Sequence, residues 1–325
     1  MPRLLLLFIA CTGCRSCGAP SATNSDSTPT DSVDTAETGE TGDTGETGDT
    51  GPEPLCPQPE VEPKDHKTDA SPITMTWWAC GAFDDPDEND WDHLSFAVER
   101  GDAVSDTWIE IDVDALNRAS VADPELIVYG PVDDGFLVED FDRETDPYVV
   151  FPVSDDGEFT LALYDKYAGS GPDYGWFLRV LEGKQPLEWD LEEVEPNDTL
   201  GDGLVALVDG ERVYGVCSDA FDLDWFVFEP QPDQPYVTLS IMANNLGSPL
   251  DARLAIYNSL GTKLEVATQG IGDTYDKDPV VSVPVDPEET YYVSVRVESD
   301  ESTQVGGSAF WYVLDVAITD EDTTG

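Results

Sequence analysis

Residues 108–113, Trp-Ile-Glu-Ile-Asp-Val, alternate apolar and polar side chains, and this pattern recurs along the chain from residue 60 onward. Residues 159–164 (Phe-Thr-Leu-Ala-Leu-Tyr), 236–241 (Tyr-Val-Thr-Leu-Ser-Ile) and 291–297 (Tyr-Tyr-Val-Ser-Val-Arg-Val) have the same texture. A side-chain period of two indicates strands with one buried face. Gly, Pro, Asp and Asn bound these runs and no long stretch has a helical period, so we expect an all-β chain built from β-sandwiches.

The strand-rich part contains an internal repeat with an offset of about 130 residues, a normal size for a β-sandwich. Four segments match in order: 60–65 with 193–198; 79–80 and 90–91 with 216–217 and 224–225; 125–129 with 253–257; and 158–164 and 176–180 with 290–296 and 311–316. This alignment makes Cys80 the equivalent of Cys217 and makes Trp91 and Trp225 the expected core anchors. We therefore predict two tandem jelly-roll-like β-sandwich domains, a divergent first one over 57–186 and a second over 187–320, with a tail at 321–325.

The first 14 residues have the features of a targeting segment. Arg3 precedes an apolar run over residues 4–10, which is too short to span a bilayer because a spanning helix needs about 20 residues. Small residues precede Cys11 and Cys14, and both stretches resemble the lipobox of bacterial lipoproteins. The resemblance implies that Cys14 or Cys11 is lipidated; a plain signal peptide with incidental cysteines is the alternative. We expect the protein to be exported and anchored by lipid to the bacterial cell envelope, at the outer membrane or cell surface.

Residues 15–56 form a linker of Thr, Gly, Asp and Glu. An acidic residue recurs at every third position from Asp31 to Asp49, and large apolar side chains are almost absent. Such a segment has little to bury, so it cannot offset the entropy cost of ordering and is expected to stay disordered and extended. We interpret it as a tether between the membrane and the sandwiches.

The charge of the chain limits its partners. Asp and Glu number 69 and Lys and Arg 15, which gives a net charge of −54. A surface this negative repels nucleic acid and anionic lipid headgroups and attracts divalent cations. Part or all of the charge could equally serve only to solvate the surface.

The second repeat carries a family resemblance. Glu-Pro-Asn-Asp at 195–198, Gly-Val-Cys-Ser-Asp at 215–219, Asp-Leu-Asp-Trp-Phe at 222–226 and the runs at 250–261 and 290–295 resemble the bacterial pre-peptidase C-terminal domain. Domains of this family are jelly-roll-like sandwiches found beside secreted proteases and on surface proteins, and collagen-binding modules are related to them. The first repeat departs from the pattern, because Lys64 replaces the Asn and an insertion follows Asp84.

Calcium is the cofactor expected for these domains. Ca²⁺ takes six to eight oxygen ligands, and the start of the second repeat offers four oxygen-bearing side chains within six residues. In the collagen-binding relatives, this acidic segment and a later Asp-rich loop bind calcium. The resemblance therefore implies a Ca²⁺ site at Glu193, Glu195, Asn197, Asp198, Asp219 and Asp222, and a weaker one at Glu60, Glu62, Asp65 and Asp87. The compatible alternative is a turn in which Asn197 and Asp198 cap backbone groups.

Catalytic motifs are absent from the sequence. The only histidines, His66 and His93, lie in a polar loop and a predicted strand, and no histidine pair has zinc spacing. No Gly-x-Ser-x-Gly motif occurs, and among 69 acidic residues carboxylate pairs carry no information. We therefore expect a protein that is not an enzyme.

Three cysteines lie beyond the signal region: Cys56, Cys80 and Cys217. Export favours disulfides. A Cys56–Cys80 pair is preferred because both residues belong to the start of the first repeat, and Cys80–Cys217 is the rival.

The sequence therefore predicts a non-enzymatic surface lipoprotein whose calcium-stabilised sandwiches bind or adhere to an extracellular polymer or protein. A purely structural or accessory envelope lipoprotein that acts as a spacer is the alternative. An accessory to a secreted hydrolase, or a carbohydrate-binding protein, is a more distant one.

Overall fold

The computed structural model describes residues 56–61, 66–84, 90–100, 107–131, 135–138, 146–201, 204–232, 235–270, 277–298 and 306–319. In these ranges the chain forms strands and three single-turn 3₁₀ helices, Lys67–Asp69, Leu116–Arg118 and Asn244–Leu246, without any α-helix. None of these short helices could cross a membrane. The expected signal segment, nearly all of the linker and the C-terminal tail lie outside the described residues.

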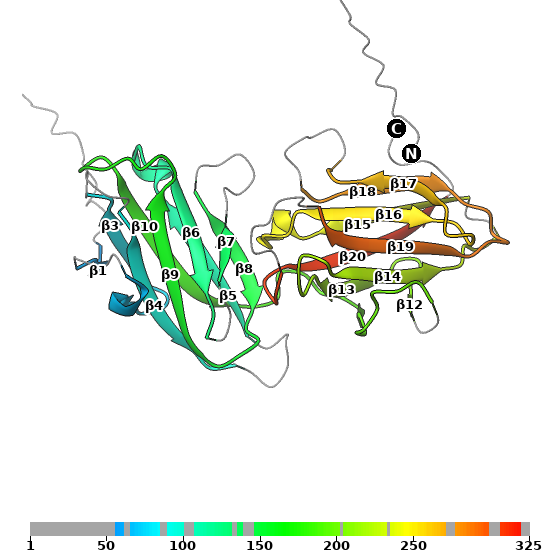
Figure 1. The fold of residues 1–325 in the computed structure, drawn as a ribbon, viewed down its shortest axis with the longest axis horizontal. Coiled ribbons are helices and arrows are strands. Elements are labelled where there is room, and N and C mark those ends of the chain that lie inside the picture. Colours follow the sequence, from blue (N-terminus) through cyan, green and yellow to red (C-terminus); the bar gives the residue numbers. More distant parts are fainter. Residues whose placement is uncertain are drawn as a thin grey trace, which may run out of the picture. The chain divides into compact units, whose positions relative to one another are not determined.

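The first sandwich consists of two five-stranded sheets (Figure 1). The sheet named here the β10 sheet has the order β1 (Gln58–Pro59), β3 (Trp78–Ala82), β10 (Gly175–Gly183), β5 (Trp108–Asp114) and β8 (Tyr148–Pro152). The β9 sheet has the order β2 (Ser71–Pro72), β4 (Asp92–Val98), β9 (Gly157–Asp165), β6 (Pro124–Tyr129) and β7 (Phe136–Val138). Only β1 and β2 pair in parallel with their neighbours.

The second sandwich repeats this topology. Its β20 sheet has the order β11 (Leu191–Glu192), β13 (Arg212–Val216), β20 (Trp311–Thr319), β15 (Tyr236–Met242) and β18 (Val280–Pro284). Its β19 sheet has the order β12 (Val205–Ala206), β14 (Leu223–Phe228), β19 (Tyr291–Val297), β16 (Ala252–Tyr257) and β17 (Lys263–Ala267). The predicted all-β class with two tandem sandwiches is confirmed.

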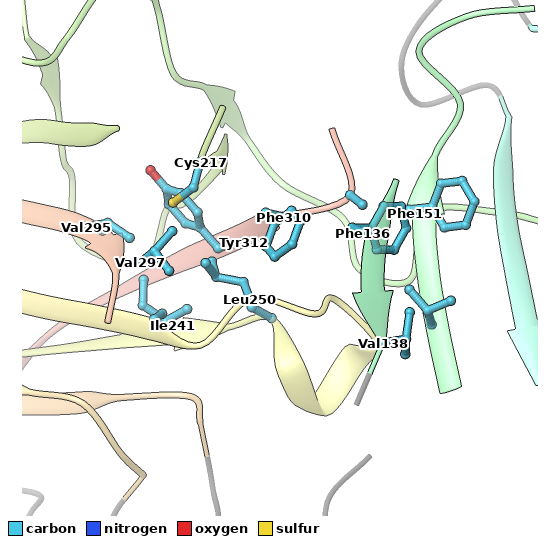
Figure 2. Close-up of a cluster of buried hydrophobic side chains, with 14 of the residues drawn as sticks. Phe136, Val138, Phe151, Cys217, Ile241, Leu250, Val295, Val297, Phe310 and Tyr312 are labelled. Carbon is cyan, nitrogen blue, oxygen red and sulfur yellow. The ribbon is translucent and has the colours of Figure 1, made fainter. Parts of the chain in front are cut away.

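The alternating pattern places the core between the sheets. In β5 the side chains of Ile109, Ile111 and Val113 are buried, and the acidic side chains between them are only partly covered on the outer face. The second sandwich buries a comparable set, and Figure 2 shows Cys217 and Tyr312 within it. Each sheet therefore has one apolar face that packs inward, as the period of two requires.

Strand registers give a residue-level alignment of the two sandwiches. Cys80 pairs with Phe177 as Tyr214 pairs with Val313, so Tyr214 is the equivalent of Cys80. The predicted equivalence of Cys80 and Cys217 is wrong by three residues. Phe83 instead occupies the place of Cys217. The backbone N–H of Phe83 donates to Tyr174 O, just before β10, and that of Cys217 donates to Phe310 O, just before β20.

Two further parts of the predicted alignment shift. Asp92 pairs with Leu163 as Asp224 pairs with Val295, so the equivalent of Asp224 is Asp92 and not Asp90. The expected core role of Trp91 and Trp225 is also wrong. Both side chains are only partly buried: Trp91 stacks on Tyr164 with ring centroids 4.3 Å apart, and Trp225 contacts Tyr257 with tilted rings at 4.9 Å. The fully buried tryptophans are Trp108, Trp176 and Trp311.

Residues Pro54–Gly325 form one compact unit that contains both sandwiches. Within it, the indole N–H of Trp311 donates to Val150 O at 2.7 Å, and Val150 N–H donates to Gly247 O at 2.8 Å. Val150 belongs to β8, an edge strand, so these two bonds occupy backbone groups that an open edge would leave unpaired. The Trp108 and Trp311 rings meet edge to face at 5.2 Å.

The cysteines divide as follows. A disulfide joins Cys56 and Cys80, with their Cα atoms 6.0 Å apart, and so ties the start of the first sandwich to β3. Cys217 is a free, buried thiol in the core of the second sandwich (Figure 2).

Candidate functional site

The candidate site is an acidic cluster at the start of the second sandwich. Glu193, Glu195 and Asp224 offer one carboxylate oxygen each, and these oxygens lie within 4.8 Å of one another. Glu195 is exposed, Glu193 is partly buried and Asp224 is completely buried. The cluster therefore runs from the surface into the protein interior.

The backbone of the first strand fixes Glu193. Its N–H donates to Tyr214 O at 2.9 Å, which continues the parallel pairing of β11 with β13. Its carboxylate turns back over β13 and accepts a hydrogen bond from Val216 N–H at 2.6 Å. The neighbouring Gly215 has no side chain, and a Cβ there would collide with the Tyr312 ring. Glycine at this position therefore lets the Tyr312 ring lie against the strand.

Asp224 occupies an inward-facing position of β14. Residues 224, 226 and 228 are buried in alternation, and the other two are phenylalanines. One oxygen of Asp224, Oδ2, accepts a hydrogen bond from Tyr312 OH at 2.6 Å, and the same hydroxyl lies 3.2 Å from Glu193 Oε2. A fully buried carboxylate with a neutral donor is costly to ionise.

Burial and the charges of neighbouring carboxylates raise the pKa values of Glu193 and Asp224. The pKa of Glu193 rises to about 7, chiefly because burial disfavours the charged form and also because Glu195 is close by. The pKa of Asp224 rises to about 9, again mainly through burial and next through the charge of Glu193. Either protons or a cation must therefore neutralise the pair near neutral pH.

Asn197 completes the cluster. Its Nδ2 donates to Glu193 Oε2 at 3.3 Å. Its amide oxygen faces two carboxylate oxygens, Asp224 Oδ1 at 3.1 Å and Glu195 Oε1 at 3.0 Å. Turning the amide over would supply donors to both of those oxygens. The turned amide satisfies these oxygens by itself, whereas with its oxygen directed at them the three carboxylates and one amide oxygen would form the type of donor set that Ca²⁺ binds.

The predicted ligands of the second repeat divide between this cluster and a turn. Glu193, Glu195 and Asn197 come together, whereas Asp198 is exposed. Asp219 and Asp222 stabilise the turn before β14: Asp219 Oδ1 accepts from Phe221 N–H at 2.6 Å, and Asp222 Oδ2 accepts from Ser218 N–H. The charge of Asp222 still contributes to the raised pKa of Asp224.

Asp224 was not among the predicted ligands. The available signal was an acidic residue at an inward position of an alternating strand, between apolar residues of the same parity. The same signal marks Asp92 in β4, whose Oδ2 accepts from Trp176 Nε1–H at 2.6 Å.

The first sandwich retains part of the arrangement. Glu60 Oε1 accepts from Ala82 N–H at 2.7 Å, as Glu193 does from Val216. The other predicted ligands of this repeat, Glu62, Asp65 and Asp87, lie outside the described residues.

The geometry is ill suited to catalysis at Asp224. No surface of Asp224 is exposed, so a substrate larger than a proton or an ion cannot touch it. Of the two histidines, His66 is exposed at the start of a 3₁₀ turn, and His93 is buried in β4. His93 stacks against Trp91, with ring centroids 6.3 Å apart.

No family model and no curated protein matches the sequence. Among solved structures, the chain is similar to the pre-peptidase C-terminal domain of a collagenase from Bacillus anthracis, with 9% identity and a TM-score of 0.27, over 36% of this chain and 98% of that chain. It is also similar to the tandem CBM51 modules of a family 98 glycoside hydrolase from Streptococcus pneumoniae, with 11% identity and a TM-score of 0.24, over 74% of this chain and 83% of that chain. Values this low indicate a distant β-sandwich relationship and carry no argument about a ligand.

Proposed function

We propose that the protein is an exported, non-enzymatic binding protein whose second sandwich is stabilised by a calcium ion bound at the acidic cluster. The observation that carries the calcium site is the convergence of Glu193, Glu195 and Asp224 within 4.8 Å. The two inner carboxylates, Glu193 and Asp224, have raised pKa values, because burial and the charges of neighbouring carboxylates oppose their ionisation. A divalent cation among them would remove that repulsion and replace the protons.

The role of the ion would be structural. Glu193 directly follows β11, and Tyr312 belongs to β20. Their side-chain hydrogen bonds to each other, to β13 and to β14 connect these four strands. An ion bound there would pin the entry of the chain into the second sandwich. The proposed binding or adhesion would then be carried by the surfaces of two stable sandwiches.

Calcium titration calorimetry on the full protein at pH 7.5 tests this proposal. We expect one saturable site that is lost in Asp224→Asn and kept in Glu265→Gln, a control that removes an exposed carboxylate of β17 in the same sandwich. Binding should release protons, because Glu193 and Asp224 are partly protonated at this pH, so the measured heat should depend on the ionisation enthalpy of the buffer. Absence of saturable binding, or equal binding by Asp224→Asn, would contradict the site.

The anchor is part of the same proposal and depends on the sequence alone. Cys14 or Cys11 would carry lipid and the acidic linker would hold the sandwiches away from the cell envelope. Mass spectrometry of the N-terminal peptide of the exported protein tests it, because an unlipidated first residue would exclude the anchor.

A further inference from the structure

The outer face of the β10 sheet carries a row of four neighbouring side chains. Arg179 of β10 pairs with Trp78 of β3 on one side and with Asp112 of β5 on the other, and Asp112 pairs with Tyr148 of β8. Residues directly opposite on adjacent strands have their side chains on the same face. An indole, a guanidinium, a carboxylate and a phenol therefore lie side by side.

These side chains are held in fixed positions. Arg179 donates to Asp112 Oδ2 at 2.9 Å, and its guanidinium lies 4.7 Å from the centre of the Trp78 ring. Arg118, from the 3₁₀ turn after β5, bonds Asp114 at 2.9 Å and lies over the ring of Phe177 at 4.6 Å. The paired arginines brace the aromatic rings through cation–π contacts.

A pocket of about 380 Å³ opens on this face. This volume is within the range of sites for small molecules, about 300–1,000 Å³. One aromatic wall and several hydrogen-bonding groups surround it, namely Trp78, Tyr148, Asp112, Asp114, Asn117 and Asp146, together with Val113. An aromatic wall with a few convergent polar groups is typical of a ligand site.

The second sandwich serves as an internal comparison. Its equivalent row reads Arg212, Asp315, Ser240 and Val280. Next to that row, Met242 and Leu246 replace Asp114 and Arg118, and both pack against the cluster around Trp108 and Trp311. The equivalent face of the second sandwich therefore carries an Arg212–Asp315 ion pair at 2.9 Å, with packed apolar side chains beside it in place of Asp114 and Arg118.

The framework of this corner, in contrast, is the same in both sandwiches. Asp146 accepts from Leu116 N–H at 3.0 Å, and Asp278 accepts from Asn244 N–H at 2.7 Å, so each caps the same 3₁₀ turn. Two pocket-lining residues, Asn117 and Asp146, have identical equivalents in Asn245 and Asp278, whereas Trp78, Asp112, Asp114 and Tyr148 differ. Their divergence on a shared framework indicates a role for the pocket that the fold alone does not require.

We propose that this pocket binds a neutral saccharide. Sugar hydroxyls both donate and accept, and the pocket supplies carboxylate acceptors, the Tyr148 hydroxyl and the Asn117 amide. The indole of Trp78 provides an apolar wall for the C–H groups of a sugar ring, and the three carboxylates disfavour an anionic ligand.

This inference rests on the proposed binding role but uses a different site from calcium. Titration of the full protein with cellohexaose, mannohexaose, xylohexaose and chitohexaose, followed by tryptophan fluorescence and calorimetry, tests it. We expect saturable binding of at least one oligosaccharide that survives chelation of calcium. Loss of the calcium site would appear in the calcium titration, and failure of the saccharide site would appear only here.

The decisive variants place the residues of the second sandwich in the first. Trp78→Arg and Asp112→Ser should each weaken binding by about tenfold or more, since each removes a main contact. Phe221→Ala, which removes a 92% exposed aromatic side chain of the second sandwich, is the control and should leave affinity unchanged. Asp112→Ser is the milder change, so it keeps the test valid if Trp78→Arg fails to fold.

Three results would overturn the proposal. The first is no binding of any of the four oligosaccharides, and the second is unchanged affinity in folded Asp112→Ser. The third is saturable binding of tetramethylammonium with no saccharide binding, which would assign the aromatic and acidic groups to a cationic ligand instead.

Discussion

Asp224 and Glu193 lie in surroundings that disfavour the ionised form of both carboxyl groups. Asp224 is fully buried under the Tyr312 hydroxyl, and Glu193 lies close enough for its charge to raise the pKa of Asp224. Without a cation, protons are the simplest way to relieve this repulsion. The stability of the metal-free protein should therefore fall as pH rises.

Both pKa values are raised on folding, to about 7 for Glu193 and about 9 for Asp224. The folded chain then holds protons that the unfolded chain has already released, so stability falls as pH rises. The contribution of these two acids should be complete below about pH 4 and should be lost as pH rises through 7 and then 9. Chemical unfolding in a chelator between pH 5 and 9 should show this loss in the wild type.

The control for this prediction is Asp224→Asn, in which the amide keeps the shape of the side chain without its charge. The stability of this variant should fall less than that of the wild type between pH 5 and 9, because the amide has no proton to lose. Parallel pH profiles for the two proteins would show that the buried acids are not coupled to folding.

The sequence contained only part of this site. Glu193, Glu195 and Asn197 lie within five residues of one another, so their spacing alone placed them together. Asp224 and Tyr312 come from distant strands and reach the cluster only through the pairing of β13 with β20 and of β14 with β19. Composition and local pattern cannot supply such long-range pairings, although an acid at an inward strand position was a usable signal.

At the level of elements, the two copies of the turn before the third strand of each sandwich use different residues for the same backbone shape. Thr76 has a φ of 77° and Gly210 a φ of 78°, and each N–H donates to the equivalent strand, at Val180 O and Val316 O. Glycine adopts this left-handed conformation freely, whereas a β-branched threonine is strained in it. The first sandwich therefore carries strain that the second does not.

Exchanging the two residues tests this strain. Thr76→Gly should raise the free energy of unfolding by about 1 kcal/mol, and Gly210→Thr should lower it by at least as much. Thr76 is exposed, so loss of packing should not mask the effect. Differential scanning calorimetry of both variants against the wild type measures the two shifts. A destabilising Thr76→Gly would mean that threonine makes a contact worth more than the strain.

The internal repeat could be detected from the sequence because β6 and β9 have the same alternation of apolar and polar residues as β16 and β19. The predicted match of residues 125–129 to 253–257 agrees with the strand register, since Leu126 and Leu254 face Leu163 and Val295. The predicted match of Cys80 with Cys217 was wrong because it relied on residue type, and these two cysteines have unrelated roles. Cys80 forms a disulfide with Cys56, and Cys217 fills the core.

At the scale of the whole molecule, charge and folding oppose each other. A net charge of −54 favours expansion of the chain by self-repulsion. Hydrophobic cores in both sandwiches and the buried Trp311–Val150 hydrogen bond work against it. A bound divalent cation would act in the same direction as the cores, because it neutralises carboxylates at the place where the second sandwich begins.

The most direct measurement of the central claim is thermal unfolding of the full protein at pH 8, in excess calcium and in chelator, for the wild type and Asp224→Asn. We predict that calcium raises the melting temperature of the wild type, with a gain of about 2.7 kcal/mol at a concentration one hundred times the dissociation constant. Calcium should not change the melting temperature of Asp224→Asn, which in chelator should melt above the wild type because an amide need not take up a proton on folding. An equal melting temperature of the wild type with and without calcium would contradict the account.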